Sequence, residues 1–121
     1  MMKRDEWFKK LFQAIDNQNS EAFLAFLSEN VFFQFGNAKP VRGKMAVGDS
    51  VNGFFESIKG LQHNLTEILV ISDTVICHGT VTYTRHDSSI LSVPFANIFK
   101  VDADLIKDYI IYVDISELYK N

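Results

Sequence analysis

The chain has 121 residues, of which 47% are hydrophobic, enough to fill the core of a single domain spanning residues 1–121 without disulfide or metal support. Its formal net charge of -3 comes with no basic run, which excludes the electrostatic footprint of a nucleic-acid-binding protein. Its only cysteine, Cys77, excludes an internal disulfide and suits a cytoplasmic location. The N-terminus lacks the apolar stretch of a signal peptide, and no segment approaches the roughly 20 apolar residues of a membrane span.

The first third of the chain predicts two helices. Apolar residues recur at helical spacing over residues 3–17 and predict an amphipathic helix, and Ser20 is a suitable N-cap for a short second helix. The apolar stripe of the first helix comprises Trp7, Phe8, Leu11, Phe12 and Ile15, and Phe23, Phe26 and Leu27 continue the spacing in the second. Two helices therefore precede any sheet.

The rest of the chain predicts a sheet interrupted by one helix. Residues 31–35 form an aromatic, β-prone run, and Pro40 and Gly43 separate this run from a helical pattern that extends to Ile58. From Leu61 to Ile115 the pattern has a period of two, with breaks that divide it into four successive antiparallel strands. This order of elements indicates an α+β fold rather than alternating βαβ units.

Several strands carry apolar residues on both faces, and three helices can cover only one face of a sheet. We expect the other face to be covered by a second copy of the chain, giving a homodimer through the outer sheet face. The residues assigned to that outer face are Val81, Tyr83, Ile98, Ile110 and Tyr112.

Four short motifs, in this order and spacing, support a family resemblance. They are Pro40-Val41-Arg42-Gly43-Lys44, Val81-Thr82-Tyr83-Thr84-Arg85, Pro94-Phe95-Ala96 and Ile111-Tyr112-Val113-Asp114. With the order of elements, they resemble the SnoaL-like group of the nuclear transport factor 2-like superfamily, which has a cystatin-like fold. The resemblance covers essentially the whole chain and implies a cone-shaped α+β barrel in which N-terminal helices pack in a strongly curved antiparallel sheet around a pocket, commonly as a dimer.

The superfamily includes ketosteroid isomerase-like, epoxide-hydrolase-like and polyketide-cyclase-like enzymes, but their catalytic positions carry different residues here. The resemblance places Leu11, Gln34 and Asn97 where the isomerases have a tyrosine and two acids. It places Thr80, Thr82 and Ile111 where the epoxide hydrolases have an arginine and two aspartates. The cyclases' ionisable pair aligns near Asn97 and Ile111. The family's catalytic carboxylates are therefore missing.

A pocket can still be assigned. Its expected lining comprises Leu11, Phe12, Phe32, Gln34, Phe55, Thr80, Thr82, Phe95, Asn97, Tyr109, Ile111 and Val113. Asn97 and Gln34 either orient a ligand or are hydrogen-bonded core amides. His63 and His78 are the candidate general bases, each with a structural role as the alternative. The three histidines do not have metal-ligand spacing, so no metal and no cofactor is expected.

Two functions fit these residues. The first is a pocket protein of unassigned activity that holds a small apolar molecule oriented by Asn97 and Gln34. The second is an isomerase-, epoxide-hydrolase- or cyclase-like enzyme in which His63 or His78 acts as the base. The missing carboxylates favour the first, and a third possibility is a cone filled completely by its own aromatic side chains.

Overall fold

The computed structural model describes residues 4–120 and contains three helices and one six-stranded sheet. The helices are α1 (Arg4–Asp16), α2 (Ser20–Leu24) and α3 (Lys44–Glu56). The strands are β1 (Leu27–Phe35), β2 (Val41–Arg42), β3 (Gly60–Ile71), β4 (Thr74–Thr84), β5 (Ile90–Asp102) and β6 (Leu105–Val113). The α+β order expected from the sequence is confirmed, although Lys3, the expected first helical residue, lies outside the described residues.

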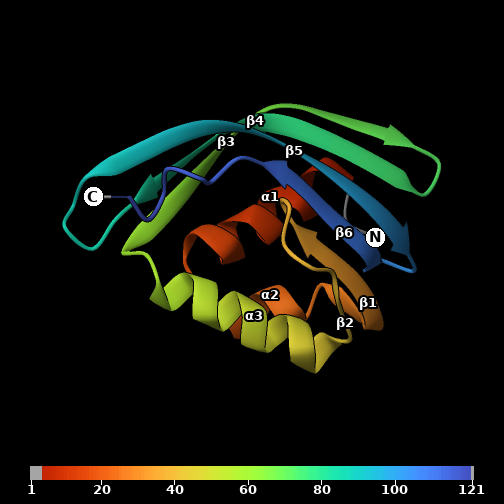
Figure 1. Ribbon diagram of the computed structural model, residues 1–121. Coiled ribbons are helices and arrows are strands. Elements are labelled where there is room, and N and C mark those ends of the chain that lie inside the picture. The colour runs from red at the N-terminus through yellow and green to blue at the C-terminus, as the bar shows by residue number, and fades with distance from the viewer. Residues whose placement is uncertain (1–3, 121) are drawn as a thin grey trace.

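The strands are ordered β2-β1-β6-β5-β4-β3, and the long strands β4 and β5 arch over the three helices, as Figure 1 shows. The final four strands form the expected antiparallel meander. The sheet as a whole is mixed, because β1 pairs with β6 in parallel, and it does not close into a barrel. A strongly curved sheet therefore wraps the helices and leaves one end of the cone open.

A glycine helps the sheet to bend. The register between β3 and β4 shifts between Leu65 and Glu67, and Gly79 lies opposite this irregularity. A Cβ atom on Gly79 would be 1.9 Å from the backbone oxygen of Asn64, a distance that no side chain tolerates. The bulged strand can approach β4 this closely only because position 79 lacks a side chain.

The helices begin and end for local reasons. Asn19, not the expected Ser20, is the N-cap of α2, because its side chain accepts a hydrogen bond from the Ala22 backbone N–H at 3.1 Å. Helix α3 continues through Gly48, where a Cβ atom would lie 3.0 Å from the Leu24 side chain. The small residue therefore lets α2 and α3 pack closely. None of the helices within residues 4–120 is long and apolar enough to cross a membrane.

The core lies between the inner face of the sheet and the helices. Phe8 and Leu11 of α1 are fully buried against this face, where Phe99 of β5 contacts the ring of Phe8 at 4.8 Å between centroids. Along β4 the inward positions include Val75, Cys77, Val81 and Tyr83, all of which are buried. The assignment of Val81 and Tyr83 to the outer face was therefore wrong, because strand alternation places both with Val75 and Cys77.

Candidate functional site

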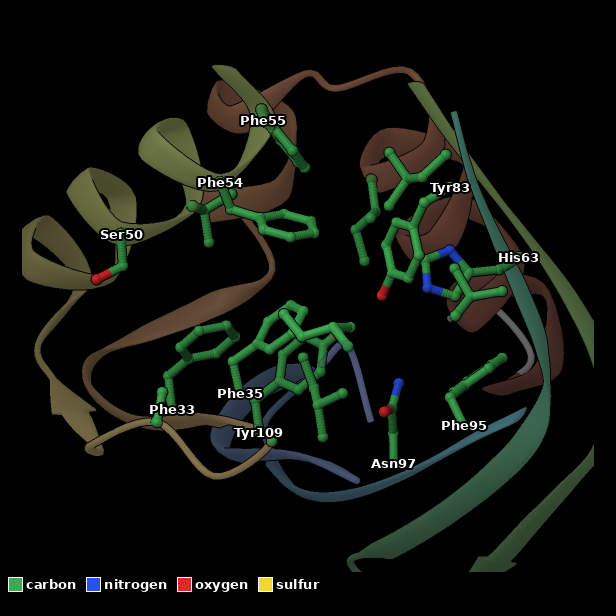
Figure 2. A pocket seen from close by; sticks show the side chains of 18 of the residues that line it. Phe33, Phe35, Ser50, Phe54, Phe55, His63, Tyr83, Phe95, Asn97 and Tyr109 are labelled. Carbon is green, nitrogen blue, oxygen red and sulfur yellow. The ribbon is translucent and has the colours of Figure 1, made fainter. Parts of the chain in front are cut away.

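The open end of the cone contains a cavity of about 300 Å³ between α3 and the inner face of the sheet. This is the lower end of the volume range of small-molecule sites, about 300 to 1,000 Å³. Phe54 and Phe55 of α3 cover one side, and Figure 2 shows Phe33, Phe35 and Tyr109 on another. The aromatic residues at this end therefore leave open space between them and do not fill the cone.

The mouth of the cavity lies between α3 and the turn after β1. Asn37 and Ala38 of the turn and Ser50 of α3 all line the cavity and are all exposed to solvent. Gly36 allows this turn to form, since its φ of 57° is in the left-handed region that favours glycine. The cavity therefore meets solvent between this turn and α3.

The polar groups of the cavity are few. Figure 2 shows Asn97 of β5, Tyr83 of β4 and His63 of β3 projecting into the same space. None of the lining residues is an aspartate, glutamate, lysine or arginine. Burial raises the pKa of Tyr83 above its ordinary value, with a smaller contribution from Tyr119, so Tyr83 is a neutral phenol at neutral pH.

Asn97 is the least satisfied polar side chain in the described part of the molecule. It is 1% exposed, and its Oδ1 is the buried side-chain atom there without a hydrogen-bond partner. A buried amide oxygen that lacks a partner costs about 1 to 3 kcal/mol of stability. An unpartnered buried oxygen needs a physical explanation, and its place in the wall of an apolar cavity makes Asn97 the candidate polar contact of the site.

His63 is held by a residue that the sequence interpretation did not consider. Its Nδ1 lies 2.6 Å from Oδ1 of Asp16 at the end of α1, and its backbone N–H donates to Oδ2 of the same carboxylate at 3.0 Å. The ring packs between Phe12 and Phe95, with centroids 4.9 and 5.1 Å away. A carboxylate at Nδ1 favours the tautomer that carries its proton on Nδ1 and leaves Nε2 free to accept one.

The expected site residues divide into two groups. Five of the expected lining residues line this cavity, namely Phe55, Phe95, Asn97, Tyr109 and Ile111, and His63 lines it as well. Leu11 is instead buried in the packed core, Phe12 is buried against His63 beneath a groove beside α1, and Val113 lies beside Gly36 just beyond the lining.

Four residues were assigned to the wrong face of their strands. Thr80 and Thr82 point to the outer face of β4, where the Thr82 hydroxyl lies 2.7 Å from that of Ser92. Phe32 stacks on Arg42, and Gln34 donates to the Ala38 carbonyl at 3.2 Å. Alternation in β1 turns Val31 and Phe33 inward, so their neighbours Phe32 and Gln34 must point away.

His78 also lies outside the cavity. Its exposed ring is on the outer face of β4, with Nε2 3.1 Å from Oε1 of Glu67. His86, the third histidine, lies 2.8 Å from the Glu56 carbonyl oxygen at the surface. Within residues 4–120, no group of three or more His, Cys, Asp or Glu side chains has the arrangement of a metal site. His63 is thus the histidine with access to the cavity.

Apart from the contact between Asp16 and His63, the sequence interpretation also missed several residues that line the cavity. Phe33, Phe35, Phe54, Val81 and Tyr83 all line the cavity. Strand alternation was the signal for four of these, since Phe33 and Phe35 are in phase with Val31 as Val81 and Tyr83 are with Cys77. The approach of Asp16 to His63, 47 positions later, had no signal in the spacing.

Solved structures share this fold over nearly the whole chain. An NTF2-like protein of unknown function from Burkholderia pseudomallei K96243 has a TM-score of 0.86 at 13% identity, covering 98% of this chain and 95% of that one. An LEH-like epoxide hydrolase from M. tuberculosis has a TM-score of 0.79 at 15% identity, covering 95% and 85%. TerC, crystallised with polyporic acid, has a TM-score of 0.81 at 12% identity, covering 96% and 95%.

These identities show a common fold and do not transfer an activity. No curated protein matches the chain significantly. The model of the SnoaL-like domain family matches residues 8–109, from the first turns of α1 to the middle of β6. The match includes α3 and the strands that carry His63, Tyr83 and Asn97, and the chain therefore belongs to the SnoaL-like domain family.

Proposed function

We propose that the chain binds a small, uncharged and mostly apolar molecule, such as a substituted single ring, that carries one hydroxyl or carbonyl group. The observation that carries this proposal is the unpartnered amide oxygen of Asn97, buried in an aromatic cavity of about 300 Å³. The amide can both accept and donate hydrogen bonds, so a hydroxyl group is its best complement. TerC, a protein of the same fold, was crystallised with polyporic acid.

The cavity also restricts what the ligand can be. A fixed charge on the ligand would lie among aromatic and aliphatic side chains, with no lysine, arginine or carboxylate in the lining to offset it. The volume of about 300 Å³ favours one ring over a large polycyclic molecule. The proposed ligand is therefore neutral when it enters.

A matched pair of probes tests this function. Phenol and toluene have nearly the same shape, but only phenol offers a hydroxyl to Asn97. We expect phenol to bind about tenfold more tightly, since a hydrogen bond to an otherwise unpartnered buried group contributes roughly 1 to 1.5 kcal/mol. Ligand-observed NMR titration measures both affinities. Equal affinities would contradict the role of Asn97, and binding of neither probe would contradict the function itself.

We also propose a homodimer through the outer sheet face. Ile76, Ile98 and Ile110 are register partners on neighbouring strands, and together they form a half-buried apolar row across β4, β5 and β6. Tyr112 extends this row on β6 and is 55% exposed. The helices cover the opposite face of the sheet, so a second copy is the partner whose surface matches an apolar row of this kind.

A charge placed in the row tests the dimer. Ile98→Lys should shift the molar mass measured by light scattering after size exclusion from that of two chains to that of one. Met45→Lys is the matched control, because Met45 is an exposed apolar residue on α3 and not on the outer face of the sheet. A wild-type chain that elutes as a monomer at all concentrations would contradict the dimer.

A further inference from the structure

We propose that residues 114–120, which follow β6, form a strap over the cavity, and that release of this strap from Arg85 lets ligands enter and leave. The inference rests on the proposed binding function and adds the route of exchange to it. In Figure 1 this part of the chain leaves β6 and runs to the turn between β4 and β5, at the open end of the cone. Ile115 of the strap lines the cavity.

The opening between α3 and the turn after β1 is narrowed by two aromatic rings. Phe35 comes directly before this turn, and Phe54 lies one helical turn after Ser50. Their ring centroids are 4.9 Å apart, a distance at which aromatic rings are in contact. An aromatic ligand cannot pass between them while they are in contact, so its exchange requires one wall of the cavity to move.

The strap is the wall with the weakest backbone attachment. The ladder between β5 and β6 ends at Val113. In the part of the chain that the structure describes, the backbone hydrogen bonds of the strap stay within it, as from Leu118 to Ile115 at 2.9 Å. Most of the other lining residues belong to helices or to strands. Segments held by few contacts open at a lower free energy than a packed sheet, so the strap can open while the sheet stays folded.

The guanidinium group of Arg85 holds the strap in place. Its Nε donates to the Leu118 carbonyl at 2.8 Å, and its Nη2 donates to the Glu117 carbonyl at 3.0 Å. Its Nη1 donates to Oγ of Ser89 and to the Ile90 carbonyl in the same hairpin, at 3.1 and 3.3 Å. All three nitrogens of the rigid, planar group are thus used, and two of them bind successive carbonyls of the strap.

Two further contacts keep the strap against the cavity. Leu118 is 1% exposed, and the Tyr119 hydroxyl lies 2.8 Å from the hydroxyl of Ser57 at the end of α3. Burial raises the pKa of Tyr83 in the cavity wall, and Tyr119 lies close enough to contribute to that shift. The strap is therefore attached by side chains alone, and each attachment can be removed singly.

The strap also explains two charged residues of the sequence motifs. Arg85 ends one of the four motifs, and Asp114 ends another. The Asp114 carboxylate accepts the backbone N–H of Ser116 at 2.9 Å, which turns the chain as it leaves β6. Neither side chain lines the cavity. Both act on a ligand only through the strap, as positioning residues.

Arg85→Met tests the role of Arg85 without a ligand. The methionine keeps an apolar stem but cannot donate hydrogen bonds to the strap. We expect the Leu118 amide to exchange with solvent deuterium at least about tenfold faster in the variant, since two charge-assisted hydrogen bonds are lost. Amides in the centre of β5 should keep their wild-type rates. An unchanged exchange rate at Leu118 would overturn the role of Arg85.

The rates of ligand exchange test the opening of the strap. NMR line shapes of phenol give its association and dissociation rate constants for each protein. In Arg85→Met we expect both rate constants to rise about tenfold and Kd to change less than about threefold, because more frequent opening speeds entry and exit alike. Phenol rates that stay at the wild-type values, although the strap amides exchange faster, would overturn the inference and leave the binding function standing.

Arg42→Met is the matched control. Arg42 also donates to a backbone carbonyl, that of Asn30 at 3.2 Å, but it joins β2 to β1 and does not contact the strap. This variant should leave the phenol rates and the amide exchange of the strap unchanged. Phenol rates that rise as much in Arg42→Met as in Arg85→Met would contradict a specific role for the strap.

Two milder variants keep the test valid if Arg85→Met does not fold. Arg85→Lys retains the charge without the planar group, so its phenol rates should lie between those of the wild type and Arg85→Met. Tyr119→Phe removes only the contact with Ser57 and should raise both phenol rates about threefold. Wild-type rates in both variants would overturn the inference. Failure of the wild type to bind phenol would overturn the binding function and the inference together.

Discussion

Two neighbouring stretches of β5 lie in different parts of the interior, one in the packed core and the other in the wall of the cavity. Phe99 lies in the packed end of the cone, fully buried with its ring 4.8 Å from Phe8 and 4.5 Å from Tyr109. Asn97, two positions earlier on the same face, lies in the hollow end with an unpartnered oxygen. The comparison shows that one strand can combine a stabilising core with a destabilised site, since packing at one end compensates for the open end.

Removing one aromatic ring from each end should give the largest difference in stability between the two ends. Phe99→Ala should lower the free energy of unfolding by about 3 to 5 kcal/mol, because it opens a void among rigid neighbours. Phe55→Ala removes the same ring from the half-buried edge of an existing cavity and should cost about 1 to 2 kcal/mol. Urea denaturation measures both, and equal losses would mean that the two ends are packed alike.

Filling the hollow end should raise the free energy of unfolding rather than lower it. Asn97→Leu removes the unpartnered oxygen and extends an apolar side chain into the cavity, so we expect the protein to gain about 1 to 2 kcal/mol of stability. The same change should weaken phenol binding about tenfold. Thr82→Val, on the outer face, should leave phenol binding unchanged.

A loss of stability in Asn97→Leu would count against this account. It would mean that the amide of Asn97 has a partner within the folded protein and belongs to the packed core. Thermal unfolding followed by circular dichroism, together with NMR titration of phenol, distinguishes an unpartnered amide from a paired one when the wild type and Asn97→Leu are compared.

The buried thiol and phenol groups near the junction of the two ends predict a smaller effect, a dependence of the protein's stability on pH. Burial raises the pKa of Cys77 from 9.0 to about 12, although a backbone hydrogen bond from Asn97 partly opposes this shift. Burial also raises the pKa of Tyr83 and Tyr109 above their ordinary values. The folded chain therefore holds protons that the unfolded chain releases, and stability should fall as the pH rises from about 9 to about 12.

Thermal unfolding across this pH range measures the effect, and Cys77→Ala should make the decline less steep. The thiol should also resist iodoacetamide in the folded protein, because the reactive thiolate is scarce and the side chain is fully buried. Rapid alkylation at neutral pH without unfolding would show that Cys77 is accessible.

The fold could be predicted from the sequence because its periodicities are long and consistent. Helical spacing marked α1, and a period of two marked the four strands of the meander. The parallel pairing of β1 with β6 could not be predicted this way, since it joins segments that are far apart in the chain and leaves no local pattern.

The site was predicted less completely, and the errors have more than one cause. On β5 the alternation that places Phe95, Asn97 and Phe99 on one face is correct, and Phe95 and Asn97 line the cavity. Where positions were carried over from relatives, as for Gln34 and Thr82, a shift of one residue placed them on the wrong face. Asp16 was missed because its partner His63 is brought to it only by the folded sheet.

A crystal structure with phenol bound tests the central claim most directly. We predict the ring inside the cavity beside Phe54 and Phe95, with its oxygen at about 2.6 to 3.2 Å from the amide of Asn97. A cavity closed by rearranged aromatic side chains, or phenol bound only at the surface with Asn97 still unpartnered, would contradict the account.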